Sequence, residues 1–150
     1  RILTEVRCAI LRVHPDLDAG RVDARLHAMD AAVEDACVNG WESVEPGIRL
    51  PDPGDRHVVA AALCGRAEAI VTHNVADFPA ESLQPLGLHA LSPDDFLLDA
   101  LDLAPAVVRR VIVEQANDAR RPPLAVEEVL EALRRAGAPR FARALADTAS

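Results

Sequence analysis

Lysine and tyrosine are absent from this sequence, and the other aromatic residues are scarce. All sixteen basic side chains are therefore arginines, and aromatic residues make up only 3% of the 150 positions. The core must then be built from Ala, Val, Leu and Ile. Many proteins that bind single-stranded nucleic acid stack bases on aromatic rings. This sequence offers few such rings, so any nucleic acid would have to be held mostly through its phosphates.

Cysteines and long apolar runs are few as well. The three cysteines lie far apart without a C-x-x-C pair, which argues against a disulfide framework and a zinc site and fits a reducing compartment. No apolar run approaches the roughly 18 residues of a membrane span. No charged and then apolar leader opens the chain. We therefore expect a cytoplasmic protein without a membrane partner.

Charge is divided unevenly along the chain. Residues 1–103 carry 8 Arg and 18 acidic residues, a net charge of -10, whereas residues 104–150 carry 8 Arg and 6 acidic residues, a net charge of +2. An acidic body repels nucleic acid unless metal ions or local Arg patches intervene. A chain of this length suits one domain with an appendage, and we divide it into residues 1–103 and a helical extension, residues 104–150.

Helical periodicity dominates both ends of the chain. Apolar residues recur at helical spacing over residues 2–13 and 17–37, which predicts two opening helices. Residues 52–55 combine an Asp cap, a following Pro and a second Asp, and they predict a helix over residues 55–65 with Asp52 as its cap. Beyond Pro105 the pattern is helical only.

Short apolar runs between the helices predict strands. Residues 69–72 form an apolar run that ends in polar residues, as a buried parallel strand does at its carboxyl end. Residues 88–91 predict a second strand, and residues 41–44 a third short one. Residues 79–86 predict a short helix, and Ser92 caps a further helix that runs to Leu101. The alternation of helices and strands predicts an α/β fold with a parallel sheet.

Oxygen-bearing side chains gather where such a sheet places its sites. Asp55 stands at a helix start, and Asn74 and Asp77 follow the strand at residues 69–72. Open α/β sheets bind ligands at the carboxyl ends of their strands. Hard cations such as Mg²⁺ and Mn²⁺ prefer oxygen ligands. These residues therefore predict a site for a divalent cation.

Two stretches carry a family resemblance. Residues 52–62, D-P-G-D-R-H-V-V-A-A-A, and residues 70–79, I-V-T-H-N-V-A-D-F-P, resemble in order and spacing the second half of the signature of PIN-domain ribonucleases, in the VapC-like toxin branch. The resemblance implies a PIN-like parallel sheet flanked by helices. It also implies that Asp55 and Asp77 are catalytic metal ligands and that Thr72 is a polar neighbour of the site.

An earlier stretch extends the resemblance. Residues 2–7, I-L-T-E-V-R, resemble the helix that carries another acid of the family, which falls on Glu5. The resemblance covers residues 1 to about 98 and implies a Mg²⁺ or Mn²⁺ site formed by Glu5, Asp55 and Asp77. Many relatives have Asp where this chain has Asn74. The metal ligand of this loop is therefore either Asn74 or Asp77.

The family's first strand, which ends in Asp, and its first helix have no counterpart ahead of Glu5. In the family fold that strand lies in the middle of the sheet, and its loss would leave buried backbone groups unpaired. We therefore predict that an N-terminal segment or a swapped element fills the slot. Direct pairing of the retained strands, with no gap and no visiting segment, would contradict this prediction.

Each candidate residue also has a plainer interpretation. Asp55 could serve only the helix start, Asp77 could be a turn residue, and Glu5 could be a solvated charge. Arg56 could contact phosphate or form a surface salt bridge. His57 and His73 could act as general bases, although a histidine beside a site is more often a hydrogen-bond partner.

The resemblance implies an endoribonuclease that hydrolyses RNA phosphodiester bonds and serves as the toxin of a toxin–antitoxin pair. The implied partners are RNA, a second copy of the chain, and an antitoxin that could place an Arg among the carboxylates. The alternative is an inactive PIN remnant that acts as a protein-interaction module. A receiver-like phosphotransfer domain is a weaker third interpretation, because the chain lacks the Lys that it would need.

Overall fold

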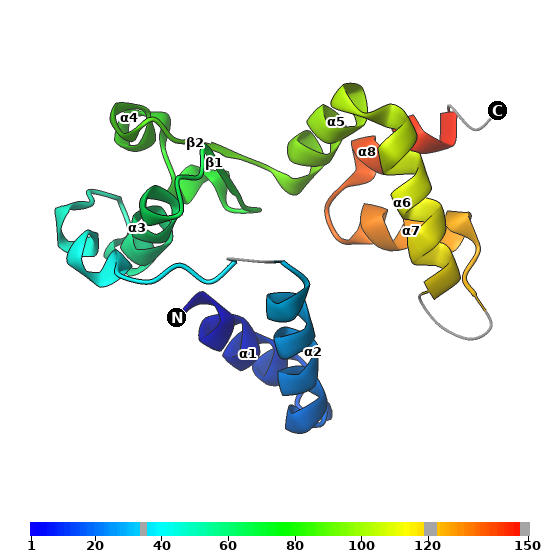
Figure 1. Cartoon of the computed structure of the whole chain (residues 1–150), viewed down its shortest axis with the longest axis horizontal. Coiled ribbons are helices and arrows are strands. Elements are labelled where there is room, and N and C mark those ends of the chain that lie inside the picture. Colours follow the sequence, from blue (N-terminus) through cyan, green and yellow to red (C-terminus); the bar gives the residue numbers. More distant parts are fainter. Residues whose placement is uncertain (34–35, 119–122, 148–150) are drawn as a thin grey trace. The chain divides into compact units, whose positions relative to one another are not determined.

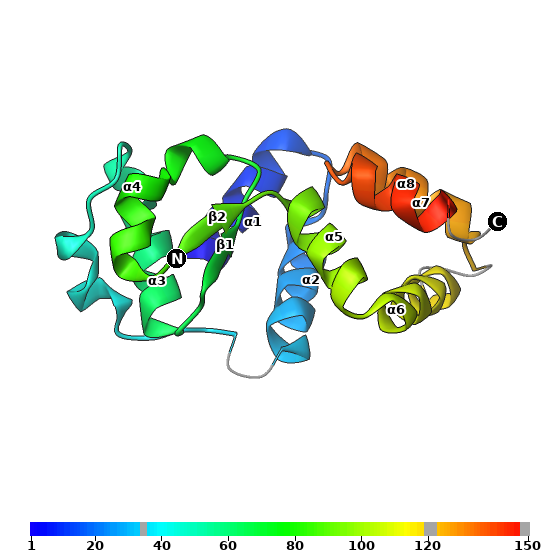
Figure 2. The same cartoon turned by 90° about the horizontal axis from the view of Figure 1, so that it is seen from above.

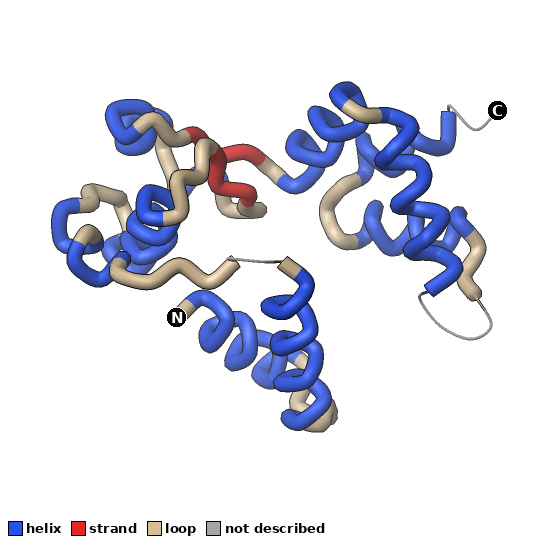
Figure 3. Tube along the Cα trace, in the orientation of Figure 1, coloured by secondary structure: helices blue, strands red, loops and turns tan. Residues whose placement is uncertain are grey.

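The chain divides into two compact units, residues 1–67 and 68–150, in the computed structural model (Figure 1). The structure describes residues 1–33, 36–118 and 123–147. Helices make up most of it, and one small parallel sheet lies in the second unit (Figure 3). The predicted α/β class is thus confirmed. In the described ranges, every helix is too short or too polar to cross a membrane.

Two helices open the first unit, as predicted. They are α1 (Ile2–Val13) and α2 (Ala19–Ala32), and they pack against each other. The Asp18 side chain caps α2 by accepting a hydrogen bond from the Arg21 backbone N–H at 3.1 Å. The helix ends at Ala32, five residues before the predicted end of the apolar stripe. Val33 already has extended backbone angles, which suit its β-branched side chain.

The predicted strand at residues 41–44 is wrong. Residues Trp41–Ser43 and Glu45–Gly47 form two successive 3-10 turns instead. The Ser43 hydroxyl donates a hydrogen bond to the Gly40 carbonyl at 2.9 Å, and Pro46 has no N–H to donate to a sheet. Local hydrogen bonds therefore take the place of strand pairing.

Helix α3 (Arg56–Cys64) confirms the helix predicted over residues 55–65. A 3-10 turn over Pro53–Asp55 leads into it. The buried residues of α3 are His57, Val59 and Ala60. The helix thereby faces the core of the first unit with its first turn and its middle.

The sheet consists of β1 (Ala69–Val71) and β2 (His89–Leu91), which confirm the two remaining predicted strands. The strands are parallel, with Ala69 opposite His89 and Val71 opposite Leu91. Between them runs a crossover with the short helix α4 (Ala80–Leu83). Its apolar residues are buried together with those of the strands, namely Ile70, Phe78, Leu83 and Leu88.

The predicted gap between the retained strands is not found. β1 and β2 pair directly, and no other segment of the described chain joins their sheet. The pairing even continues past β1, because the Thr72 N–H donates to the Leu91 carbonyl at 3.0 Å. The facing backbone N–H and C=O groups of β1 and β2 therefore form hydrogen bonds with each other, with no third segment between the strands. The prediction that another segment fills a slot between the two retained strands is therefore wrong.

Four helices complete the second unit: α5 (Pro93–Leu103), α6 (Pro105–Asp118), α7 (Val126–Arg135) and α8 (Pro139–Asp147). Helix α8 lies against α5 and α7 (Figures 1 and 2). All four helices contribute to one apolar core, formed by Leu101, Ile112, Ala116, Val129, Leu130, Ala138, Phe141, Ala142 and Leu145. The core unites α5 with the helices that follow it, and the division at residue 103 stays a prediction.

A buried carboxylate joins the starts of α5 and α8. Asp94 is only 6% exposed. Its oxygens accept hydrogen bonds from the Phe141 N–H at 2.8 Å, the Arg140 N–H at 3.1 Å and the Arg140 Nε at 3.0 Å. Burial raises the pKa of Asp94, but the backbone hydrogen bonds and the guanidinium outweigh it and lower the pKa overall. The carboxylate thus supplies the cap that α8 lacks in its own sequence.

Candidate functional site

Asp55 lies at the junction of the 3-10 turn and α3. The turn is held by Asp52, whose side chain accepts a hydrogen bond from the Gly54 N–H at 2.7 Å. The predicted capping role of Asp52 is therefore confirmed. Asp55 is half-buried, and its side chain does not cap α3. Helix capping by its side chain thus does not explain this acid.

Glu5 lies against the first turn of α3. There it contacts His57, which comes two residues after Asp55 in the sequence. Its Oε2 is 3.2 Å from Nε2 of His57, and its Oε1 accepts a hydrogen bond from Nε of Arg1 at 2.9 Å. Burial raises the pKa of Glu5, but the Arg1 hydrogen bond and the nearby His57 outweigh it and lower the pKa overall. The first unit therefore brings two of the predicted site residues to the start of one helix.

His57 contacts both Glu5 and the turn that precedes α3, and it is only 3% exposed. Its Nδ1 lies 2.8 Å from the Gly54 carbonyl oxygen. Because a carbonyl only accepts, Nδ1 must carry the proton of this hydrogen bond. Its Nε2 is within ion-pair distance of Glu5 but has no partner of hydrogen-bond geometry in the described part of the chain. His57 thus forms a hydrogen bond with the turn at the start of α3. This agrees with its interpretation as a hydrogen-bond partner beside the site.

Arg56 was the predicted contact to phosphate. Its side chain is half-buried, and its Nε is buried without a hydrogen-bond partner among the described residues. A surface salt bridge involving Arg56 is not seen in those residues. Its contact with phosphate stays a prediction.

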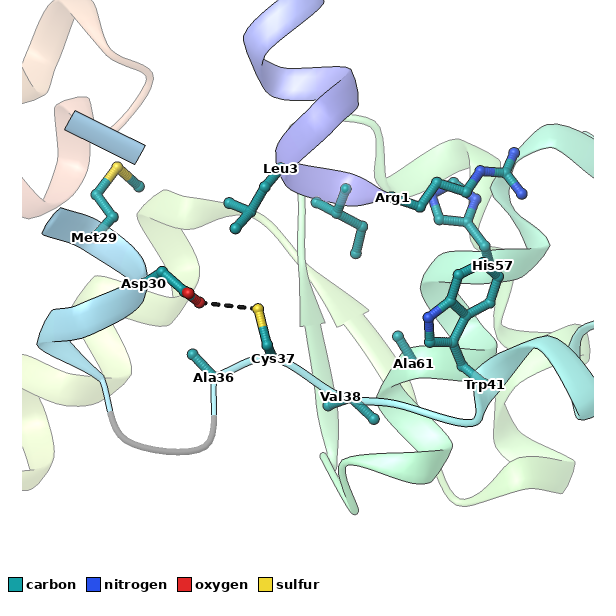
Figure 4. A pocket seen from close by; sticks show the side chains of 11 residues that line it. Arg1, Leu3, Met29, Asp30, Ala36, Cys37, Val38, Trp41, His57 and Ala61 are labelled. Atoms are coloured by element: carbon teal, nitrogen blue, oxygen red, sulfur yellow. Dashed lines mark hydrogen bonds between the residues drawn. The ribbon is translucent and has the colours of Figure 1, made fainter. Parts of the chain in front are cut away.

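Figure 4 shows the cavity beside this helix start, which has a volume of about 330 Å³. Trp41 and His57 form one side of it, with ring centroids 6.1 Å apart. Asp30 lies across the cavity and accepts a hydrogen bond from Sγ of Cys37 at 2.9 Å. The lining is otherwise largely apolar, with Met29 and Leu3 among its members. Trp41 therefore lies next to the candidate site through its contact with His57.

The remaining predicted residues form one hydrogen-bonded cluster in the second unit, directly after β1. The Thr72 hydroxyl accepts from the Asn74 N–H at 3.1 Å, and the Asn74 side-chain amide donates to Oδ2 of Asp77 at 2.6 Å. Asn74 and Asp77 thus orient each other, and both retain oxygens that could bind a cation. The choice between the two as metal ligand remains open.

The donor set is divided between the two units. Glu5 and Asp55 belong to residues 1–67, and Asn74 and Asp77 belong to residues 68–150. In the parts of the chain that the structure describes, no group of three His, Cys, Asp or Glu side chains is arranged to hold a metal ion. The oxygen donors suit Mg²⁺ or Mn²⁺ chemically, but the described residues do not complete such a site by themselves.

Comparison with known proteins supports the resemblance read from the motifs. The family described as the VapC50 C-terminal domain matches residues 93–147. A protein of Mycobacterium tuberculosis (strain ATCC 25618 / H37Rv) named "Putative ribonuclease VapC50" is 47% identical over 79 residues. That stretch covers 53% of this chain and 47% of the relative, so the match spans about half the length of each. No solved structure matches the chain.

The match to the C-terminal domain begins at Pro93, the first residue of α5, and ends with α8. The similarity of the chain to VapC50 agrees with the family that residues 52–62 and 70–79 predicted. The chain is thus a relative of the VapC-like PIN ribonucleases.

Proposed function

We propose that the complete protein is a metal-dependent endoribonuclease that hydrolyses RNA phosphodiester bonds. The observation that carries the proposal is the 47% identity to a relative whose name gives it as a ribonuclease. The paired motifs around Asp55 and Asp77 and the contact of Glu5 with the α3 start support it. The proposal includes a PIN-like fold for the complete protein.

In this proposal Glu5, Asp55 and Asp77 are the catalytic carboxylates, with Asn74 as the alternative ligand in the strand-tip loop. A bound Mg²⁺ or Mn²⁺ would supply charge neutralisation at the phosphate and an acidified water. The chain's own residues prepare the carboxylates. Arg1 and His57 hold Glu5 at the α3 start, and Asn74 orients Asp77.

The proposed partners follow from the same family. They are an antitoxin protein, a second copy of the chain in a homodimer, and an N-terminal segment or swapped element that extends the sheet. We also propose a cytoplasmic location. An antitoxin Arg that entered the site would compete for the same carboxylates that hold the cation.

One variant pair tests the proposal. Asp55→Asn keeps the size of the side chain but removes its charge, and it should lower the rate of RNA cleavage with Mn²⁺ by at least about 100-fold, since even changes around metal ligands cost about 10–100-fold. Asp52→Asn is the matched control. Asn caps turns as well as Asp does, so this variant should cleave at the wild-type rate. Equal rates for Asp55→Asn and wild type would refute the assignment.

The second candidate is a catalytically inactive interaction module. The two candidates differ in one measurement. An inactive module predicts no Mn²⁺-dependent cleavage by the wild-type protein, together with an unchanged affinity of Asp55→Asn for its protein partner.

A further inference from the structure

The turn between α7 and α8 touches the strand-tip loop. His73 follows Thr72 at the carboxyl end of β1. Its imidazole lies beside Gly137, on the side where another residue would carry its Cβ. A Cβ at position 137 would lie 2.5 Å from Cε1 and 3.1 Å from Nδ1 of His73. Distances this short are below van der Waals contact. The ring therefore rests where only glycine leaves room for it.

A second contact holds the same part of the C-terminal helices to the start of α5, the helix that follows β2. Asp94 comes three residues after Leu91, the last residue of β2, and its carboxylate holds the start of α8 through Arg140 and Phe141. β1 and β2 are parallel neighbours, so their carboxyl ends lie at one edge. The segment from Gly137 to Phe141 thus contacts His73, two residues after β1, and Asp94, three residues after β2.

The strand-tip loop is the part of the second unit that carries candidate site residues. Thr72 and Asn74 flank His73 and are hydrogen-bonded across it, and Asn74 in turn orients Asp77. The His73 side chain belongs to the backbone segment that joins Thr72 to Asn74, so its contact with Gly137 joins this segment to the turn between α7 and α8. Small displacements of catalytic groups lower rates strongly.

We propose that the His73 ring packs on Gly137. Through this contact the C-terminal helices position the loop that carries Thr72, Asn74 and Asp77 for RNA cleavage. His73 is a positioning residue in this arrangement. The inference rests on the proposed ribonuclease function for its consequence in catalysis, but the positioning itself can be measured without RNA.

The chain offers a matched pair of glycines for the test. Gly137 and Gly87 both have positive φ angles, +95° and +73°, where an L side chain is strained. A Cβ at position 137 would meet His73, whereas a Cβ at position 87 would meet nothing within 4 Å. Gly137→Ala and Gly87→Ala thus share the backbone strain and differ in the contact with His73. Because the imidazole is the end of an exposed side chain, we expect the added methyl to move the ring and leave the fold intact.

The first measurement is the NMR spectrum of the full chain. Gly137→Ala should shift the backbone amide signals of Thr72, Asn74 and Asp77, and Gly87→Ala should leave them unchanged. His73→Ala should shift the amide signals on both sides of the contact, including that of Gly137. Loop signals that stay at their wild-type positions in Gly137→Ala, or a Gly137 signal that stays at its wild-type position in His73→Ala, would overturn the proposal. This arm remains decisive even if Gly137→Ala does not fold, because His73→Ala tests the same contact from the other side.

The second measurement is RNA cleavage by the complete protein with Mn²⁺. Gly137→Ala should lower kcat by about tenfold or more and leave KM nearly unchanged, because it misplaces reacting groups without removing a substrate contact. The double variant His73→Ala with Gly137→Ala should be no slower than His73→Ala alone, since both changes act through one contact. A kcat of Gly137→Ala equal to that of Gly87→Ala, or losses that simply multiply in the double variant, would contradict the proposal.

The two arms separate the two ideas. A wild-type protein that does not cleave RNA refutes the proposed function, while shifted loop signals in Gly137→Ala still support the positioning. Unshifted loop signals refute the positioning, while cleavage by the wild-type protein still supports the function.

Discussion

Asp94 shows how much one residue can do at the junction of two helices. A buried carboxylate is costly unless hydrogen bonds replace its water. Here two backbone N–H groups of α8 and the Arg140 guanidinium replace it. The same bonds satisfy donors at the start of α8 that no residue of that helix could satisfy. The side chain therefore caps a helix 46 positions away from it in the sequence.

Replacing Asp94 should destabilise the protein. Asp94→Ala leaves the Arg140 and Phe141 N–H groups without an acceptor and should lower the free energy of unfolding by about 2 kcal/mol. Asp94→Asn keeps an acceptor but loses the charge, and should lie between this variant and wild type. Urea unfolding would measure the differences.

Asp99→Ala is the matched control, since Asp99 lies on the exposed side of the same helix. Its effect should stay within about 0.5 kcal/mol. If Asp94→Ala were no less stable than Asp99→Ala, the capping role of Asp94 would be wrong.

The candidate site contains both a local contact that the sequence predicts and a long-range contact that it does not. Asp52 was predicted as a cap, and the structure confirms it, because a cap acts on the two or three residues next to it. The contact between His57 and Glu5 joins residues 52 positions apart. No local pattern predicts such a contact, since it depends on how α1 packs beside α3.

At the level of elements, helix α7 has half of a capping box. The Glu128 side chain accepts a hydrogen bond from the Ala125 N–H at 2.9 Å, but the alanine at the N-cap has no oxygen to return the bond. Glu131 pairs with Arg134 in the last turns, where basic residues also suit the helix dipole.

Completing the box should stabilise the helix. Ala125→Ser supplies the missing acceptor and should raise the free energy of unfolding by about 0.5–1 kcal/mol. Ala132→Ser is the control, because Ala132 is exposed in the middle of the same helix, where serine only lowers helix propensity. Thermal unfolding of both variants would decide the matter, and a lower midpoint for Ala125→Ser than for wild type would show the N-cap assignment to be wrong.

Elements that depend on local signals were predicted well, and the failure among them is instructive. The predicted caps Asp52 and Ser92 and the two paired strands stand where the sequence placed them, to within a few residues. Residues 41–44 have strand-like side chains but form turns. A strand must form hydrogen bonds with a neighbouring strand. Residues 41–43, close to Pro46, instead form backbone hydrogen bonds within local turns.

For the whole molecule, net charge and the ion pairs together predict acid sensitivity. The chain carries a net charge of -8 at pH 7, and carboxylates in both units have lowered pKa values. A hydrogen bond from Arg7 lowers the pKa of Asp23 in the first unit. Hydrogen bonds from Ser92 and Arg140 lower the pKa of Asp95 in the second, as the contacts of Asp94 do for its own pKa. Each of these groups is more acidic in the folded chain than in the unfolded one.

The sign of the effect follows from linkage. A carboxyl group with a lowered pKa in the folded state stabilises the fold fully above its ordinary pKa of about 4, and this contribution is lost as the pH falls through the lowered value. The free energy of unfolding should therefore be level from pH 7 to about pH 5 and fall below pH 4. Asp94→Asn should show a shallower fall than wild type in urea unfolding at pH 7, 5, 4 and 3. Parallel curves for the two proteins would contradict the role assigned to Asp94.

The sequence by itself determined most of the helices, the caps Asp52 and Ser92, the two paired strands and the resemblance to a family. All of these depend on residues a few positions apart, whose spacing decides which backbone groups are satisfied and which side chains share a face. It also singled out Glu5, Asp55, Asn74 and Asp77 as candidates.

Only the tertiary structure decided which side chains meet. It directly pairs the two strands, brings Glu5 to His57, attaches Asp94 to the start of α8 and rests His73 on Gly137. These contacts join residues far apart in the chain, and they exist because packing and burial select one arrangement among the many that the local patterns allow.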